Sequence, residues 1–219
     1  KHKANLGLAY DGDADRLIAV DENGNIVDGD HIMVLSAIHL KNKGKLAQDT
    51  LVVTVMSNIG LTIAAKEHGI NLATTAVGDR YVLEEMKNSG YNLGGEQSGH
   101  MIFLDYNTTG DGVLSSLVLA QIVLEEGKNL SELAAVMTQY PQVLVNARIK
   151  NENKNRYMEY PEIKSEIERI EKLLDGCGRV LIRPSGTEPL VRVMLEGKEE
   201  GQIKELATNL ANLIQEKLS

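Results

Sequence analysis

The chain has 219 residues, of which 42% are hydrophobic and 25% charged, a composition typical of an ordinary soluble globular protein. Its formal net charge of −8 and the lack of a dense lysine and arginine cluster argue against a nucleic-acid partner. No apolar run approaches the ~20 residues that a membrane span needs, so we expect no membrane association. The one cysteine, Cys177, excludes an internal disulfide and favours a cytoplasmic location.

Two strands are expected at the start of the chain, over residues 4–10 and 16–21, on either side of an acidic loop. The Asn23-Gly24 pair that follows is typical of a turn into a third, short strand. A strand pattern begins at once, and no methionine or signal-like stretch precedes it. We therefore expect the chain to start inside a longer protein.

Helices and strands are expected to alternate through the middle of the chain, with glycines such as Gly44, Gly69 and Gly90 ending the helices. The expected elements are a helix over 31–43, a strand over 51–57, a helix over 59–68, a strand over 71–77, a helix over 79–88, a strand broken by a glycine loop over 92–103, and helices over 111–126 and 130–139. This order predicts an α/β domain with a mixed, mostly parallel sheet and flanking helices.

The order of elements changes after Tyr140-Pro141, which is typical of a linker. The elements expected beyond it are a strand over 143–150, a helix over 162–174, strands over 179–183 and 190–196, and a helix over 201–218. They predict a small α+β domain with an antiparallel hairpin. We place the boundary between the two domains near residues 138–142.

The first motif that carries chemistry is Asp-Gly-Asp-Ala-Asp-Arg, residues 11–16. Carboxylates at alternate positions offer oxygen ligands to a hard divalent cation. In a straight strand they would lie ~6.6 Å apart, so the loop must curl to bring them to one ion. Three aspartates packed at one strand end would repel one another without a cation. The candidate metal ligands are therefore Asp11, Asp13 and Asp15.

Three other interpretations of this loop stay open. An EF-hand would place Glu22 at its twelfth position, but it needs glycine where Arg16 stands and helices where strands are expected. A phosphatase of the haloacid dehalogenase type has threonine or valine where Asp15 stands. The third interpretation is an acidic turn exposed to water.

The second motif is Gly-Gly-Glu-Gln-Ser-Gly-His, residues 94–100. Its glycines let the backbone approach a ligand, while Glu96, Ser98 and His100 offer an acceptor, a hydroxyl and a titratable base, a set that suits a sugar ring. The spacing differs from the G-x-S-x-G of a serine hydrolase. A polar hairpin loop without function is the alternative. A weaker signal, equally well explained by a helix cap, is formed by Gly78, Asp79 and Arg80.

The third motif is Arg-Pro-Ser-Gly-Thr-Glu-Pro, residues 183–189, with a second arginine on the strand that follows. Guanidinium groups, hydroxyls and the N–H groups of a turn are suited to holding a phosphate. An ordinary β-turn explains the proline and glycine but not both arginines and both hydroxyls. The candidate phosphate ligands are Arg183, Ser185, Gly186, Thr187 and Arg192.

In this order and spacing, the three motifs resemble the metal, sugar and phosphate loops of the α-D-phosphohexomutase superfamily, and the resemblance covers the whole chain. The particular sequences of the three motifs, DGDADR, GEQSGH and RPSGTEP, are similar to those of its phosphoglucosamine mutase branch. Members of the superfamily have four domains. The resemblance implies that residues 1–28 are the tail of the metal-binding second domain, 29–140 the sugar-binding third domain and 141–219 the phosphate-binding fourth domain.

The resemblance also implies an activity: interconversion of glucosamine 6-phosphate and glucosamine 1-phosphate through a phosphoserine and Mg²⁺, for cell-wall amino-sugar synthesis. The aspartates would hold Mg²⁺ beside Arg16, and His100 would act as a general acid or base. The motif around residues 94–100 and the segment 78–80 would bind the sugar. The 183–192 segment would hold the phosphate that is not being transferred.

The chain departs from the superfamily because it has no T-A-S-H-N-P-type segment, so the phosphoserine would come from the missing N-terminal half of the same protein, and the chain alone would be inactive. The strand before Asp11 would then lie at an open sheet edge, and pairing of two copies into a homodimer is a further hypothesis. Two alternatives stay open: a mutase of glucose or mannose phosphates, and a non-catalytic module that binds phosphosugars.

Overall fold

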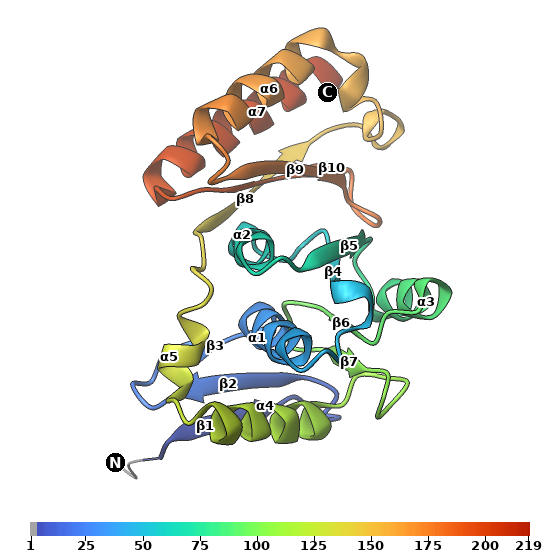
Figure 1. Ribbon diagram of the computed structural model, residues 1–219. Helices are drawn as coiled ribbons and strands as arrows, with labels where there is room; N and C mark the ends of the chain where they lie inside the picture. Colours follow the sequence, from blue (N-terminus) through green and yellow to red (C-terminus); the bar gives the residue numbers. More distant parts are fainter. Residues whose placement is uncertain (1–3) are drawn as a thin grey trace. The chain divides into compact units, whose positions relative to one another are not determined.

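The computed structural model describes residues 4–219, so the first three residues of the predicted 1–28 segment lie outside the described part (Figure 1). The chain forms two compact units, Lys1–Gln139 and Tyr140–Ser219. The residues predicted to be a second-domain tail belong to the first unit. Their assignment to a separate domain stays a prediction.

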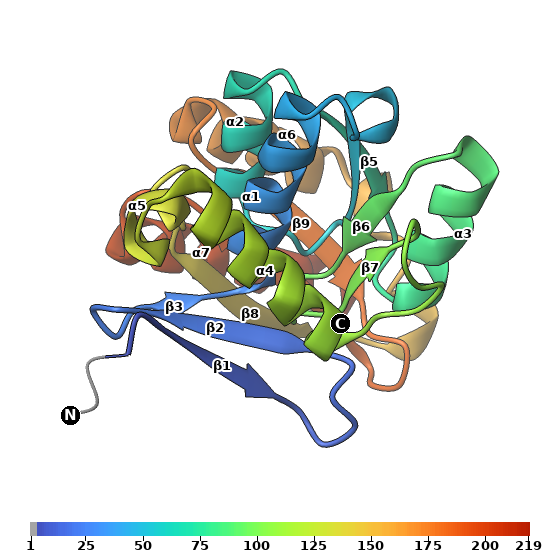
Figure 2. The same ribbon diagram turned by 60° about the horizontal axis from the view of Figure 1, so that its bottom comes forward.

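The first unit begins with a small antiparallel sheet of β1 (Leu6–Tyr10), β2 (Leu17–Asp21) and β3 (Ile26–Val27). The turn before β3 is held by the carboxylate of Asp21, which accepts the backbone N–H groups of Asn23 and Asn25 at 2.9 and 2.8 Å. Helix α4 (Gly112–Glu126) packs along this sheet (Figure 2). As expected, β1 lies at an edge, and pairing of two copies through it stays a prediction.

The second sheet of this unit has the order β5-β4-β6-β7. Its strands are β4 (Thr50–Thr54), β5 (Asn71–Thr75), β6 (Leu93–Gly95) and β7 (Met101–Phe103). Strand β4 pairs in parallel with β5 and β6, whereas β6 and β7 are antiparallel, so the sheet is mixed as expected. Strand β4 ends earlier than the predicted 51–57 because its last hydroxyl, on Thr54, accepts the N–H of Met56 and turns the chain.

Three further helices of the first unit pack against this sheet: α1 (Gly29–Asn42), α2 (Ile59–Glu67) and α3 (Asp79–Ser89), whereas α5 (Leu130–Ala134) packs against α1. A short 3-10 turn at Ala47–Asp49, which the sequence did not predict, precedes β4. Helix α5 is shorter than the predicted 130–139. The chain beyond it lies against α2, where a Cβ on Gly60 would come within 1.9 Å of the Thr138 carbonyl oxygen, so this stretch follows the neighbouring helix instead of continuing its own.

The core of the first unit is mostly aliphatic, because the chain has no tryptophan and one phenylalanine, Phe103, which lies in this core. It joins β2, β4 and helices α1, α2 and α4, and its largest fully buried members include Leu17, Ile32, Met33, Leu51, Leu61 and Leu119. Because both sheets contribute to this one core, the loops at the ends of β2 and β6 are held by rigid elements.

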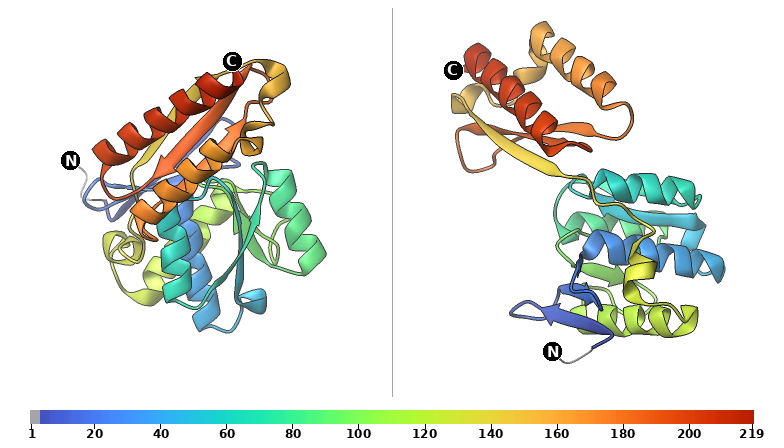
Figure 3. Two further views of the ribbon diagram at one scale, coloured as in Figure 1. Left: turned by 90° about the horizontal axis from the view of Figure 1, so that it is seen from above. Right: turned by 90° about the vertical axis from the view of Figure 1, so that its left-hand side faces the viewer.

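The second unit has a three-stranded antiparallel sheet of order β8-β10-β9, formed by β8 (Gln142–Arg148), β9 (Arg179–Pro184) and β10 (Leu190–Glu196). Helices α6 (Pro161–Leu174) and α7 (Glu200–Leu218) lie side by side against it (Figure 3). Two short 3-10 turns, Asn151–Asn153 and Tyr157–Glu159, lie between β8 and α6. The unit has a separate core, so the predicted small α+β domain is present.

None of the helices within residues 4–219 has the length and apolar character required to cross a membrane.

Candidate active site

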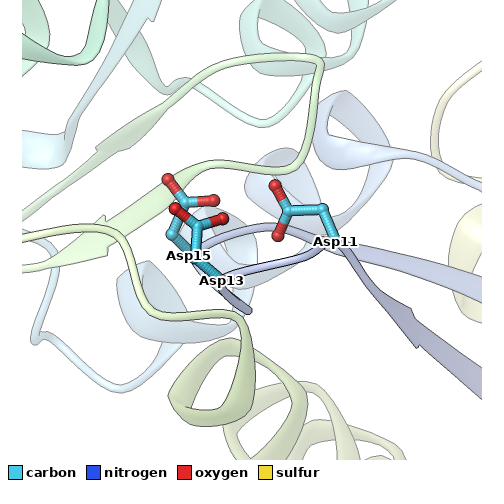
Figure 4. A group of neighbouring side chains, drawn as sticks. All are labelled: Asp11, Asp13 and Asp15. Carbon is cyan, nitrogen blue, oxygen red and sulfur yellow. The ribbon is translucent and has the colours of Figure 1, made fainter.

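The loop between β1 and β2 brings three carboxylates together, as the sequence predicted. One oxygen from each of Asp11, Asp13 and Asp15 lies within 4.8 Å of the others, and Figure 4 shows the three side chains gathered at the loop. The curl comes from Ala14, whose φ of 59° lies in the left-handed region and whose N–H bonds back to the Asp11 carbonyl at 3.3 Å. This spacing is short enough for the three side chains to share one divalent ion.

Arg16 closes the loop on its own carboxylates. Its Nε lies 3.7 Å from Asp11 Oδ2 and 3.8 Å from Asp15 Oδ1, and its backbone N–H donates to Asp11 Oδ1 at 3.2 Å. Partial desolvation pushes the pKa of Asp11 upward. The hydrogen bond from the Arg16 N–H and the charge of its guanidinium outweigh it, so the net pKa of Asp11 is lowered. Asp11 is therefore an anion at neutral pH, as a metal ligand must be.

The two oxygens of Asp15 have different surroundings. Oδ2 lies 2.9 Å from Nδ1 of His100, whereas Oδ1 is buried and has no hydrogen-bond partner. A buried carboxylate oxygen without a hydrogen bond is costly, because it has lost water, and the guanidinium of Arg16, with Nε at 3.8 Å, lies beyond hydrogen-bond range. An oxygen-coordinated cation at the aspartates would satisfy it. The residues of this loop therefore fit a hard divalent ion such as Mg²⁺.

The second motif lies directly beside the aspartate loop. Arg16 and His100 form an antiparallel bridge, and the N–H of Leu17 donates to the Gly99 carbonyl at 3.0 Å. Gly99 has a φ of 95°, and a Cβ there would lie 2.3 Å from the Leu17 carbonyl oxygen, so only glycine permits this approach. Sequence reasoning named both motifs but had no signal that joined them.

The segment 78–80, the weaker of the predicted sugar-binding segments, also lies next to the 94–100 loop. The backbone N–H of Gly78 donates to Glu96 Oε1 at 3.0 Å, and Gly78 precedes the first turn of α3. Asp79 is exposed, and Arg80 stacks over the Tyr81 ring, 4.6 Å from its centroid, at the surface. Glu96 therefore links the two segments. Ser98 is exposed at the tip of the loop, where a ligand hydroxyl has access to it.

Gln97, which was not predicted from the sequence, attaches the same loop to the start of α1. Its Nε2 donates to Asp28 Oδ2 at 3.3 Å, and its carbonyl accepts the N–H of Gly29 at 3.1 Å. Asp28 is the N-cap of α1, and its carboxylate also binds His31 Nδ1 at 2.7 Å and Gln139 Nε2 at 3.2 Å. The candidate sugar loop is thus seated on the start of α1.

The third motif lies in the second unit, at the turn between β9 and β10. The register places Arg183 directly opposite Arg192, so both guanidinium groups leave the same face of the sheet. Ser185 is buried, and its Oγ accepts the N–H of Glu188 at 3.2 Å. A Cβ on Gly186 would meet no atom within 4 Å. The fold of the turn does not require this glycine, which is compatible with the predicted close approach of a ligand.

Lys154 adds a positive charge that the sequence gave no reason to select. Its ammonium group donates to the Ser185 carbonyl at 2.8 Å, from the segment that follows β8. Thr187 is exposed beside it, and Arg192 lies 3.5 Å from Glu188 Oε2. The turn therefore gathers the arginines, hydroxyls and backbone N–H groups that the phosphate prediction named.

Two family models match the chain. The α/β/α domain III of phosphoglucomutase/phosphomannomutase matches residues 28–140, and the C-terminal domain of the same family matches residues 144–213. The chain belongs to the phosphoglucomutase/phosphomannomutase family. This confirms the resemblance inferred from the motifs and the predicted α/β and α+β fold classes.

Relatives within this family are close in sequence. A phosphoglucosamine mutase of Clostridioides difficile (strain 630) is 84% identical over all 219 residues, which make up 49% of its length. A phosphoglucosamine mutase of Caldanaerobacter subterraneus subsp. tengcongensis is 65% identical over the same span and also covered to 49%. The chain spans about half the length of the curated relatives it matches.

Solved structures share the fold of this family. An Aspergillus fumigatus N-acetylphosphoglucosamine mutase in complex with GlcNAc-6P and magnesium is 22% identical with a TM-score of 0.76, over 97% of this chain and 49% of that one. A phosphoglucomutase/phosphomannomutase family protein of Burkholderia thailandensis is 20% identical with a TM-score of 0.75, over 99% and 48%. At these identities the likeness concerns the fold alone.

Proposed function

We propose that this chain carries the metal, sugar and phosphate sites of a phosphoglucosamine mutase, which interconverts glucosamine 6-phosphate and glucosamine 1-phosphate. The observation that carries the proposal is the junction of the aspartate loop with the 94–100 loop, through the Arg16–His100 bridge and the His100–Asp15 contact. This junction brings the three carboxylates next to the 94–100 loop, which supports a cation site beside a sugar site. The 84% identity to a protein named phosphoglucosamine mutase supports the choice of substrate.

In this proposal Asp11, Asp13 and Asp15 hold Mg²⁺, which when bound neutralises negative charge on the phosphoryl group being transferred. Arg16 lies beside the carboxylates with its side chain half exposed, so its guanidinium is available to a phosphoryl oxygen. The magnesium in the Aspergillus fumigatus complex supports the choice of ion.

Glu96 and Ser98 are the proposed ligands of the sugar, with Gly78, Asp79 and Arg80 beside them. Glu96 Oε1 is occupied by the Gly78 N–H, which orients the carboxylate and leaves Oε2 for a sugar hydroxyl. The GlcNAc-6P bound to the Aspergillus fumigatus protein supports a phosphosugar as the substrate class. A carboxylate and a hydroxyl suit a sugar because each of its hydroxyl groups both donates and accepts.

The turn of the second unit is the proposed holder of the phosphate that is not being transferred. Arg183 and Arg192 supply charge, while Ser185, Gly186 and Thr187 supply hydroxyl and backbone donors. Charge-assisted hydrogen bonds of this kind are about twice as strong as neutral ones. Because the unit has its own core, we expect it to bind inorganic phosphate on its own.

The donor of the reaction is a phosphoserine that this chain does not contain. The serine transfers its phosphoryl group to a sugar hydroxyl, which gives a bisphosphate, and the other phosphoryl group returns to the serine oxygen as the product hydroxyl is released. We propose that the part of the protein matched to the other half of the relatives supplies this serine, that the chain is inactive without it, and that the reaction takes place in the cytoplasm.

The test is cation binding by the chain itself, with Mn²⁺ as a probe followed by electron paramagnetic resonance. We expect weak but specific binding that Mg²⁺ displaces and that Asp13→Asn abolishes, because removal of one charge leaves too few anionic ligands. Asp105→Asn, an acidic residue away from the loop, is the control. Unchanged binding in the folded Asp13→Asn chain would remove the metal assignment.

A further inference from the structure

Lys154 lies half-buried between β8 and α6, directly after the 3-10 turn Asn151–Asn153. Its ammonium group donates to the carbonyl oxygen of Ser185 at 2.8 Å, across 31 positions of sequence. Within residues 4–219 no carboxylate forms an ion pair with this ammonium group. Holding a lysine side chain in one conformation costs rotational freedom. The contact with the phosphate turn, and not the pairing of charges, is therefore what fixes Lys154.

The chain around Lys154 is itself attached to the rest of the second unit. The side-chain amide of Asn153 donates to the Leu218 carbonyl of α7 at 3.0 Å. Three positions after Lys154, the hydroxyl of Tyr157 donates to the Ile182 carbonyl of β9 at 3.3 Å. The lysine therefore reaches the turn from a backbone that is held on both sides.

The carbonyl that accepts the Lys154 hydrogen bond belongs to the peptide group that joins Ser185 to Gly186. This peptide group is trans, so it is planar and its C=O and N–H point to opposite sides. Because Lys154 holds the C=O on one side, the N–H of Gly186 is directed to the other. In the part of the chain that the structure describes, the N–H groups of Gly186 and Thr187 have no acceptor in the protein. Two successive donors are thus available to a ligand.

The turn also carries more positive than negative charge. Arg183 and Arg192 lie opposite each other on β9 and β10, and within residues 4–219 only the second has an ion-pair partner, Glu188, at 3.5 Å. Together with Lys154 these side chains comprise three cations and one carboxylate, a net charge of +2. Such an excess favours a doubly negative anion, the form in which phosphate groups exist near neutral pH.

We propose that Lys154 is a positioning residue of the phosphate site. It holds the Ser185–Gly186 peptide so that the Gly186 N–H faces a bound phosphate group. Without Lys154 this peptide can rotate, and the N–H loses its direction toward the anion. This inference rests on the proposed function, because it takes the turn between β9 and β10 as the phosphate site.

Two variants of Lys154 and one matched control test the role. Lys154→Met keeps the length of most of the side chain and removes the donor, whereas Lys154→Arg keeps both a donor and the charge. We expect the affinity of the full chain for inorganic phosphate, measured by calorimetry, to fall about tenfold in Lys154→Met and to be largely restored in Lys154→Arg. Lys150→Met is the control for loss of a nearby charge, because Lys150 is exposed and lines a surface pocket together with Glu188.

The amide proton of Gly186, followed by NMR, reports on the peptide itself. Saturation with phosphate should move this resonance downfield in the unmodified chain and in Lys150→Met, and should move it less in Lys154→Met. A phosphate that binds the unmodified chain without moving this resonance would overturn the inference, and this measurement needs no variant to fold.

The calorimetric titrations also separate this inference from the proposed function on which it rests. Failure of the unmodified chain to bind phosphate would overturn the phosphate site and this inference together. Equal affinities of Lys154→Met and Lys150→Met, or an affinity of Lys154→Arg as low as that of Lys154→Met, would overturn this inference alone.

Discussion

At the scale of single residues, two features of the proposed sites stand out: the carboxylates of the metal loop lie close together, and the glycine of the phosphate turn has open space around it. The aspartates repel one another and stay together because the backbone and Arg16 hold them. Gly186, in contrast, has open space around it and no positive φ. The proposed ligands would account for both features: a cation would offset the repulsion between the aspartates, and a phosphate would lie close to the Gly186 backbone.

Gly186→Ala is therefore expected to leave stability unchanged or slightly raised, because the new methyl meets no atom and restricts the unfolded chain. We expect binding of inorganic phosphate to weaken, because the methyl occupies the side from which the anion would approach. Calorimetry with phosphate measures the affinity, and Gly201→Ala, another open glycine of the same unit, is the matched control. Equal phosphate affinities for the two variants would show that the Gly186 backbone is not a ligand.

The sequence identified the residues of each motif but not their partners. Asp15 and His100 lie 85 positions apart, and only the fold brings Nδ1 to the carboxylate. Gln97 and Lys154 carry no local pattern either, because their importance comes from the Asp28 and Ser185 atoms they reach. Motif spacing reports local geometry, whereas contacts between motifs depend on packing.

At the scale of elements, helix α1 connects the sugar loop to the end of the first unit. Its N-cap, Asp28, receives Gln97 from the loop and Gln139 from the last residue of the unit. Desolvation pushes the pKa of Asp28 upward. The hydrogen bonds and charge of His31 and the amide of Gln97 outweigh it, so the net pKa is below its usual 3.8.

Asp28→Ala is expected to destabilise the first unit by about 1 kcal/mol or more, since it removes a helix cap and leaves the buried backbone N–H and ring Nδ1 of His31 without their acceptor. Because the folded pKa is lowered, the stabilisation by Asp28 is complete above its ordinary range and is lost as the pH falls through the folded value. Urea unfolding should therefore show the gap between Asp28→Ala and wild type shrinking below about pH 4. The exposed Asp49→Ala is the control, and a gap independent of pH would contradict the assignment.

The positions of most helices and strands can be predicted from hydrophobic periodicity and from the glycines that end helices, because both are local features of the sequence. Four helices end close to a glycine, and the last residue of each lies within one or two positions of the predicted one. These glycines are Gly44, Gly69, Gly90 and Gly127. The misjudged ends are those set by distant contacts. Strand β4 stops at a side-chain turn on Thr54, and α5 stops where the chain meets Gly60 of α2. Neither contact has a signature in the local sequence.

At the scale of the whole molecule, the two units have separate hydrophobic cores, and their cores share no residue. The first unit carries the proposed metal and sugar loops, and the second unit carries the proposed phosphate turn. We therefore expect each unit to fold and unfold independently, because each core is formed by the sheet and helices of its own unit.

Leu210→Ala tests the division. Leu210 is fully buried in α7, so its truncation should destabilise the second unit by about 2–5 kcal/mol and weaken phosphate binding at physiological temperature. Mn²⁺ binding in the first unit should be unchanged. Leu61→Ala, equally buried in the first unit, should give the reverse pattern. Loss of both binding activities in either variant would mean that the units do not fold independently.

The central claim is that this chain supplies the metal, sugar and phosphate sites of a phosphoglucosamine mutase. Its most direct test joins the chain to the half of the Clostridioides difficile relative that it does not match, and follows glucosamine 6-phosphate by phosphorus NMR with Mg²⁺ and a bisphosphate activator. We expect conversion to glucosamine 1-phosphate that is faster than conversion of glucose or mannose phosphates, and no conversion by the chain alone. A folded chimera without conversion, or turnover by the chain alone, would contradict it.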